Sequence, residues 1–197
     1  MIEHKQATPC SYQAASGPIL LLAWYWLMEA RTKLPIRIMP TNNLHPIFTA
    51  ELHEMHWFEN AWVTTLGQLG RSSCLPDLGS VLKKERAYTQ EHVNRLWQIY
   101  ISIDEHPESQ ECEALSGLIT DLKTACERLG GNEPSADLSF ILSVIKAANY
   151  QIGAYSAMLL LAQSMQYTEA EKLITDTIGE EKQTIIDMTR LLTLYND

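Results

Sequence analysis

Proline placement is the feature that most constrains how this chain can fold. A proline inside a helix removes one backbone hydrogen bond and clashes with the preceding turn, so prolines mark helix ends and long proline-free stretches favour helices. After residue 41 the prolines are few, and long proline-free stretches separate them: Pro46, Pro76, Pro107 and Pro134. This spacing leaves room for several long helices.

Within each stretch, apolar side chains recur at steps of three and four residues, which places them on one helical face. The pattern covers residues 52–66, 78–100, 115–125 and 138–162, and a last helix is predicted to begin at the capping box Thr168-Glu169-Ala170-Glu171. No segment alternates apolar and polar residues between tight turns, so a sheet is not predicted. We therefore predict an all-α, antiparallel bundle of four long helices with a shorter additional helix in the crossover.

Composition narrows the class of protein. With 197 residues, of which 46% are hydrophobic, the chain has enough apolar material for a buried core. The excess of 24 Asp and Glu over 15 Lys and Arg gives a net charge of −9, which is the wrong sign for binding nucleic acid. The 4 cysteines form no Cys-x-x-Cys pair, which argues against a zinc knuckle or a disulfide-stapled secreted module. We expect a cytoplasmic protein.

Residues 1–40 differ from the rest and are predicted to be an N-terminal extension of the bundle at 41–197. Their apolar run, residues 19–28, is about half the ~20 residues needed to cross a bilayer, and charged residues follow it at once, so no membrane span is predicted. The segment also lacks the basic start and small-residue cleavage site of a secretory signal. Two explanations stay open: translation begins at Met39, or the extension is an extra helix or arm packed on the bundle.

Acidic residues interrupt the apolar stripes and are the candidates for chemistry. Glu59 and Glu181 each lie seven residues from an apolar residue on either side, so both are predicted to point inward. Glu85 and His92 are also seven residues apart and share a face. A buried carboxylate needs a partner, a proton or a metal ion. Four-helix bundles hold pairs of iron or manganese ions with such residues, usually through Glu-x-x-His, a motif that this chain lacks.

Five collinear segments of the chain resemble the YciE/YciF-like proteins, a group of ferritin-like bacterial proteins associated with stress and of unassigned activity. The segments are ELHEMHWFENA (51–61), HVNRL (92–96), CEALSGLI (112–119), KAANYQIGAYSAMLLLAQSM (146–165) and AEKLITDTIGEEKQT (170–184). The resemblance runs from about Leu44 to Leu192 and leaves the first 40 residues unmatched. It implies a ferritin-like fold, usually assembled as a homodimer.

The resemblance also implies a depleted metal site. The glutamate of the family's first helix falls on Glu59, and that of its last helix falls on Glu181 or on its neighbour Glu180. The family's other ligand positions carry residues that bind hard cations poorly or not at all: Ala87, Gln90, the stretch 146–152 (KAANYQI) and Ile185. A conventional di-iron centre is therefore not expected.

Two functions follow from this reading. The first is a non-catalytic, stress-associated scaffold or interaction protein with a degraded di-iron site and no cofactor. In this case Glu59 and Glu181 are hydrogen-bonded structural groups, with Tyr88, Asn149 or Gln151 as donors. We expect a homodimer that binds neither nucleic acid nor membrane, and the sequence does not identify a further protein partner.

The alternative is a metal-binding protein or oxidase with a rearranged site for one or two iron or manganese ions. Glu59 and Glu181 would then be joined by ligands from the first two long helices, and the candidates are His56, Glu85 and His92. The sequence names no catalytic residue in either case, and whether the protein is an enzyme stays open.

Overall fold

The structure is a computed structural model that describes residues 43–69, 76–128 and 134–193, all within the unit Met39–Asp197. Every regular element in these ranges is a helix, as predicted from the proline and apolar spacing. The elements are α2 (His45–Leu69), α3 (Pro76–Ser102), α4 (Glu113–Arg128), α5 (Pro134–Met165) and α6 (Thr168–Thr193). The predicted extension at residues 1–40 and the start at Met39 lie outside the described residues.

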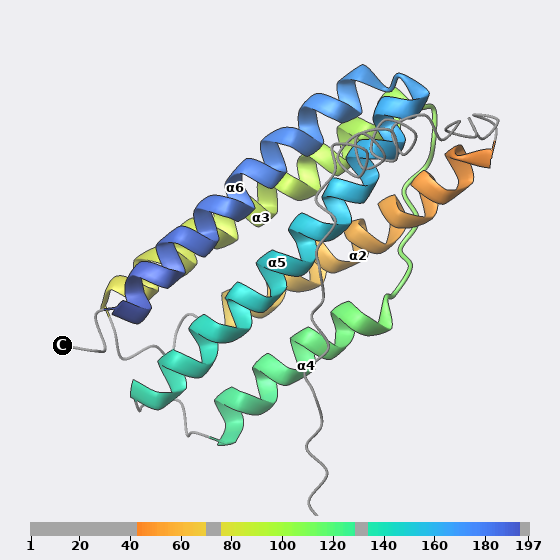
Figure 1. Cartoon of the computed structure of the whole chain (residues 1–197). Coiled ribbons are helices and arrows are strands. Elements are labelled where there is room, and N and C mark those ends of the chain that lie inside the picture. The colour runs from red at the N-terminus through yellow and green to blue at the C-terminus, as the bar shows by residue number, and fades with distance from the viewer. Residues whose placement is uncertain (1–42, 70–75, 129–133, 194–197) are drawn as a thin grey trace, which may run out of the picture. The chain divides into compact units, whose positions relative to one another are not determined.

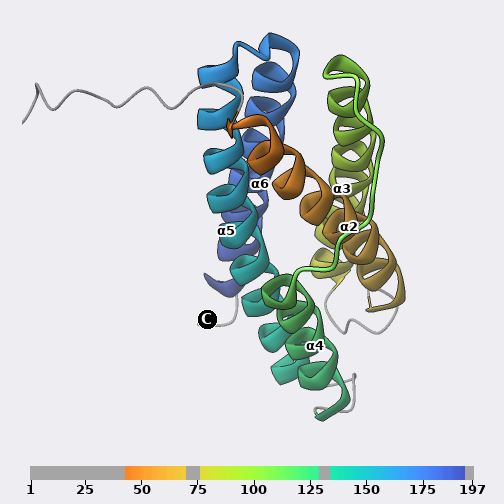
Figure 2. The ribbon, with the colours of Figure 1, turned by 90° about the vertical axis from the view of Figure 1, so that its right-hand side faces the viewer.

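The four long helices form a closed ring in the order α2, α3, α6, α5, with α4 packed against α5 and α2 (Figure 1). In Figure 1, α2 and α6 run in one direction and α3 and α5 in the other, so neighbours in the ring are antiparallel. Because α3 and α5 run the same way, the chain must travel back along the bundle between them. Residues 103–112 and α4 make this return, which is the predicted crossover with its shorter helix (Figure 2).

One end of the bundle is fastened by His45, the first residue of α2. Its Nε2 donates to Glu105, just beyond α3, and its Nδ1 accepts from the hydroxyl of Tyr167, each over 2.8 Å. Tyr167 belongs to the tight turn between α5 and α6, in which Gln166 adopts a left-handed conformation with φ of 59°. These bonds join three segments that are distant in sequence and hold the helix ends in register.

Large apolar side chains fill the ring, and each contributes roughly 1.5–3 kcal/mol when fully buried. Phe58 and Trp62 of α2 stack with ring centroids 5.4 Å apart, and both are fully buried. Helix α5 has core neighbours on more than one side, so the predicted stripe residues Ile145, Ile152 and Leu159 are half-buried at the edge of the core. None of the helices in the described ranges is long and apolar enough to cross a membrane.

Candidate functional site

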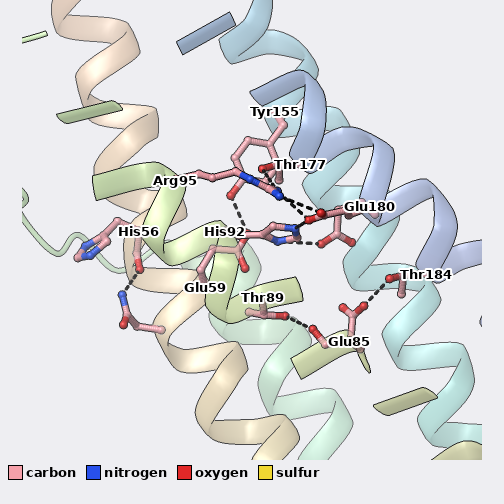
Figure 3. A network of polar contacts seen from close by, with 12 residues as sticks. His56, Glu59, Glu85, Thr89, His92, Arg95, Tyr155, Thr177, Glu180 and Thr184 are labelled. Atoms are coloured by element: carbon pink, nitrogen blue, oxygen red, sulfur yellow. Dashed lines mark hydrogen bonds and ion pairs between the residues drawn. The ribbon is translucent and has the colours of Figure 1, made fainter. Parts of the chain in front are cut away.

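A polar cluster lies at the centre of this apolar core, and all four long helices contribute to it (Figure 3). Its inward-facing members are Glu59 of α2, Glu85, Thr89 and His92 of α3, Gln151 and Tyr155 of α5, and Glu181 and Thr184 of α6. The three glutamates and the histidine each expose at most 1% of their surface. Such burial is rare for charged groups unless they are paired or bind a metal ion.

Helical periodicity explains why these residues face one another. Glu85, Thr89 and His92 follow each other at steps of four and three residues on α3, so they lie on one face. Gln151 and Tyr155 are four residues apart on α5. The ring of antiparallel helices then directs these faces to the same point.

His92 lies at the centre of the cluster, between the carboxylates of Glu59 and Glu181. Its Nδ1 is 3.5 Å from Glu59 Oε1 and 3.4 Å from Glu181 Oε1. Neither this Nδ1 nor Glu59 Oε2 has a hydrogen-bond partner. A neutral imidazole that carries its proton on Nε2 would direct the Nδ1 lone pair at both carboxylates, so a proton or a cation is required between them.

The other nitrogen of His92 is held from the outside. Nε2 lies 3.0 Å from Glu180 Oε2, and Arg95 donates two hydrogen bonds of 2.7 and 2.8 Å to the same carboxylate. Arg95 also donates to Thr177 Oγ1 over 3.2 Å. Burial raises the pKa of the Glu180 carboxyl, but the bonds from Arg95 and His92 outweigh it and lower the pKa to about 2. A carboxylate that fixes the second nitrogen of a histidine is typical of metal-binding histidines.

Helix α5 supplies the contacts on the opposite side. The Tyr155 hydroxyl donates to Glu59 Oε1 over 2.6 Å, and burial together with this carboxylate raises the pKa of Tyr155 well above its usual range. The Gln151 amide meets the same oxygen at 2.9 Å and Glu181 Oε1 at 3.2 Å, and it donates to both when its nitrogen faces them. Gln151 therefore lies across the gap between the two carboxylates.

Glu85 occupies a separate position within the cluster. Its Oε2 accepts a hydrogen bond from the Thr184 hydroxyl, and its Oε1 has no hydrogen-bond partner. Burial raises the pKa of Glu85, although Thr184 and His92 oppose the shift. Burial also raises the pKa of Glu181 well above its usual range, and the charge of Glu85 adds to this effect.

The charges of the cluster do not balance when every group is ionised. Three buried carboxyls, Glu59, Glu85 and Glu181, meet the single imidazole of His92, while Arg95 and Glu180 compensate each other. Full ionisation would leave two negative charges in the core. Two protons would restore the balance. A divalent cation bound to a neutral His92 would leave one negative charge, which one further proton would remove.

The structure brings together most of the candidate ligands predicted from the sequence. Glu59, Glu181 and His92 form the one group of potential metal ligands found among the described residues, with ligand atoms within 4.8 Å of one another. Glu180 lies on the outer side of His92, and Glu85 lies beside the group. His56 is not part of it, because its ring packs against Trp97 and Tyr100 at centroid distances of 5.9 and 5.8 Å.

The register inferred from the resemblance is wrong on two helices. Ala87 and Gln90 are exposed, and the inward positions of α3 are Thr89 and His92. On α6, Ile185 is half-buried and Thr184 faces the cluster. Ala87 and Gln90 each lie two residues before an inward position, and Ile185 lies one residue after one. Because each residue turns a side chain by about 100° around the helix axis, these positions lie off the inner face.

Three side chains were predicted to donate hydrogen bonds to the buried glutamates, and only one of them lies close enough to do so. Gln151 faces Glu59 and Glu181. Asn149 is exposed and donates to the carbonyl of Ile145 in its own helix, and Tyr88 lies under the ammonium of Lys84. Gln151 differs because it alone shares the α5 face that carries Tyr155.

No complete sequence motif marks Thr89, Thr184 or Arg95, and none of them was predicted to be part of the site. Thr89-x-x-His92 and Glu181-x-x-Thr184 each have the spacing of Glu-x-x-His with one half replaced by threonine. Counting three residues back from His92 and three forward from Glu181 would have found both threonines. Arg95 carried no such signal, because its partner Glu180 is 85 residues away in sequence.

Comparison with known proteins assigns this bundle to a family. The sequence profile of a family described as "Domain of unknown function (DUF892)" matches residues 43–196. Protein YciF of Escherichia coli (strain K12) is 26% identical over 154 residues, which are 78% of this chain and 92% of that protein. The family resemblance stated from the sequence is confirmed.

Solved structures show the same fold. The crystal structure of the E. coli stress protein YciF aligns with a TM-score of 0.69 at 24% identity, covering 75% of this chain and 93% of that one. YcfI from Rhodopseudomonas palustris aligns with a TM-score of 0.67 at 20% identity, covering 79% and 97%. The predicted ferritin-like helical fold is confirmed.

Proposed function

The chain belongs to the DUF892 family, and we propose that it is a non-catalytic bundle protein that holds one divalent transition-metal ion between Glu59, His92 and Glu181. The observation that carries the proposal is His92 Nδ1, which lies between two carboxylates without a hydrogen bond while Glu180 holds Nε2. Burial lowers the pKa of His92, but the carboxylates around it outweigh burial and raise the pKa to about 10, so a proton on Nδ1 is one partner that fits here. A metal ion is the other, because a carboxylate on the second nitrogen is typical of metal-binding histidines.

Two of the separations between donor atoms support this assignment. Ligands bound tetrahedrally at about 2.1 Å lie about 3.4 Å apart. His92 Nδ1 lies 3.4 and 3.5 Å from the two carboxylate oxygens. One nitrogen and two oxygens suit manganese, iron or zinc. An ion bound there would supply positive charge to the core.

Gln151 completes the set of ligands in this proposal. With the amide turned so that its oxygen faces inward, that oxygen stands 2.9 Å from Glu59 Oε1 and 3.2 Å from Glu181 Oε1. A fourth protein ligand makes a closed coordination sphere, which is typical of structural rather than catalytic sites. The complete burial of all three charged ligands also favours a structural role.

The same geometry favours one ion over two. A di-metal bundle site uses Glu-x-x-His on two helices and one glutamate on each of the other two. Here α3 offers Thr89-x-x-His92, α6 offers Glu181-x-x-Thr184, and α5 offers Gln151. We infer that the chain keeps half of a dinuclear site and has lost the ligands of the second ion.

The test is metal content per chain. Tag-free protein from cells supplemented with iron and manganese is purified without chelators and analysed by elemental mass spectrometry. We expect about one ion per chain, near zero for Glu181→Gln, and an unchanged value for the control Glu171→Gln, a half-buried carboxylate on the same helix. Two ions per chain would indicate a dinuclear site instead.

A metal-free scaffold is the second candidate, and one observation favours it. Tyr155 and Gln151 can satisfy Glu59 by hydrogen bonds, which leaves the cluster stable once protons balance its charge. Protein without metal, yet folded and insensitive to added metal ions, would support this candidate. A role in stress is a further part of the proposal, supported by similarity to the E. coli stress protein YciF. A homodimer and a cytoplasmic location are also part of it, and they rest on the resemblance and the cysteine pattern of the sequence.

A further inference from the structure

The three charged ligands of the proposed site have almost no contact with solvent. Glu59 and Glu181 expose none of their surface and His92 exposes 1%. Among the side chains described in hydrogen-bond contact with them, Tyr155 and Gln151 are also buried, whereas Glu180 is 25% exposed. Glu180 is therefore the most exposed of these polar contacts, and a cation arriving from solvent beside the ligands would meet it first.

Arg95 closes this route from the outside. Both guanidinium nitrogens of one edge bind the Glu180 carboxylate, and Nη1 also donates to Thr177, so the side chain spans the seam between α3 and α6. In Figure 3, Arg95 and Glu180 lie beside His92 at this seam. Glu180 Oε2 is shared by Arg95 and by His92 Nε2, so the bond that closes the seam also holds the imidazole in place.

Two acidic residues act on Arg95 from the outer surface. Glu91 and Asp176 are exposed, one on α3 and one on α6, and both act electrostatically on Arg95. The Asn94 side-chain amide donates a hydrogen bond of 3.0 Å to the Glu91 carboxylate. Negative charge on this surface favours the approach of a divalent cation and offers the Arg95 guanidinium alternative partners.

We propose that the Arg95–Glu180 ion pair is the entrance of the metal site: an arriving divalent cation displaces Arg95 from Glu180, and Glu180 is the first residue to bind the ion. Release of Glu180 also frees His92 Nε2, so the imidazole can turn and let the ion pass to Glu181, the next residue of α6. This inference rests on the proposed function, because it concerns how that site is loaded.

Metal-binding kinetics test the entrance. Apo protein is mixed with Co²⁺ in a stopped-flow instrument, its visible absorption reports uptake, and excess EDTA measures release from the loaded protein. We expect Arg95→Ala to accelerate uptake and release by about tenfold, because the Arg95–Glu180 ion pair is lost while the ligands remain. Glu180→Gln should slow uptake, since an amide accepts the His92 hydrogen bond but binds a cation weakly.

A second ion pair on the same two helices provides the control. Lys84 and Asp187 join α3 to α6 over 2.7 Å and do not contact the ligands. Lys84→Ala should leave both rates unchanged, which separates an entrance from a general loosening of the seam. Arg95→Lys, which keeps the charge without the two-pronged contact, should give an intermediate rate and serves if the alanine variant folds poorly.

The outcomes separate the two proposals. Stoichiometric Co²⁺ binding with equal rates in wild type, Arg95→Ala and Arg95→Lys would overturn the entrance and leave the metal site intact. Equal acceleration by Lys84→Ala would also overturn it, because the effect would then belong to the helix seam. Failure of the wild-type protein to bind Co²⁺, Mn²⁺ or Zn²⁺ would overturn the metal site and the entrance with it.

Discussion

Gln151 is the residue whose role depends most on what the cluster contains. With its nitrogen inward it donates to Glu59 and Glu181, and with its oxygen inward it offers a ligand at the same point. A glutamine can serve both states because its amide carries a donor and an acceptor on opposite sides. This residue therefore connects the two functions considered from the sequence.

Gln151→Leu removes both roles with little change in volume. We expect metal affinity to fall by roughly 10–100-fold, the range found when a group that supports a metal site is removed. Isothermal titration with Mn²⁺ or Zn²⁺ measures it. Gln183→Leu, a half-buried glutamine on α6 that bonds to Asp187, is the matched control. Equal affinity in wild type and Gln151→Leu would remove Gln151 from the ligand set.

At the scale of elements, α3 and α6 each carry half of a ligand pair. Thr89 stands three residues before His92, and Thr184 stands three residues after Glu181. Both threonines are buried and face the cluster. The helices thus already present the positions that a second ion would need, and only the side chains differ.

The double variant Thr89→Glu, Thr184→His should raise metal content from about one to about two ions per chain. Its larger side chains in a packed core should destabilise the metal-free form by about 1–3 kcal/mol. Elemental analysis and thermal unfolding check the two effects. Thr64→Glu with Thr189→His, both exposed, is the control that adds the same groups on the outside of the bundle. One ion per chain in the double variant would mean that the backbone no longer supports a second site.

Helix α5 contains a glycine that packing does not require. Gly153 is exposed, and a Cβ built there meets nothing within 4 Å. Gly153→Ala should therefore raise the free energy of unfolding by about 0.5–1 kcal/mol, because alanine loses less backbone entropy in a helix. Urea denaturation measures it, and Ser156→Ala, exposed three residues later, is the comparison. A lower stability of Gly153→Ala would show that this face of α5 is covered in solution.

At the scale of the whole molecule, the cluster joins all four long helices at one point. A ligand that binds only the folded state at 100 times its Kd adds about 2.7 kcal/mol. For a chain of this size we expect a rise in Tm of roughly 5–10 °C with saturating Mn²⁺ or Zn²⁺, reversed by EDTA. His92→Ala should abolish the rise, whereas His106→Ala, exposed beyond α3, should retain it. The same Tm with and without metal would favour the metal-free scaffold.

The helices could be predicted closely because their signals are local. Proline positions, the three- and four-residue spacing of apolar side chains and the capping box at Thr168 depend only on nearby residues, and α6 begins at that threonine. The inward direction of Glu59 and Glu181 followed from the same periodicity. The ligand register on α3 was wrong by two residues, since Ala87 and Gln90 are exposed, because similarity between sequences does not fix which side of a helix faces the core.

The sequence by itself determined the all-helical class, the approximate positions of the helices and the presence of carboxylates on apolar faces, since each is a property of one helix and its own periodicity. Only the tertiary structure decided which of these residues meet. Glu180 and Arg95 are 85 residues apart, and Glu59 and Tyr155 are 96 apart. Their contacts depend on the order and direction of helices around the ring, and side-chain spacing within a single helix carries no information about either.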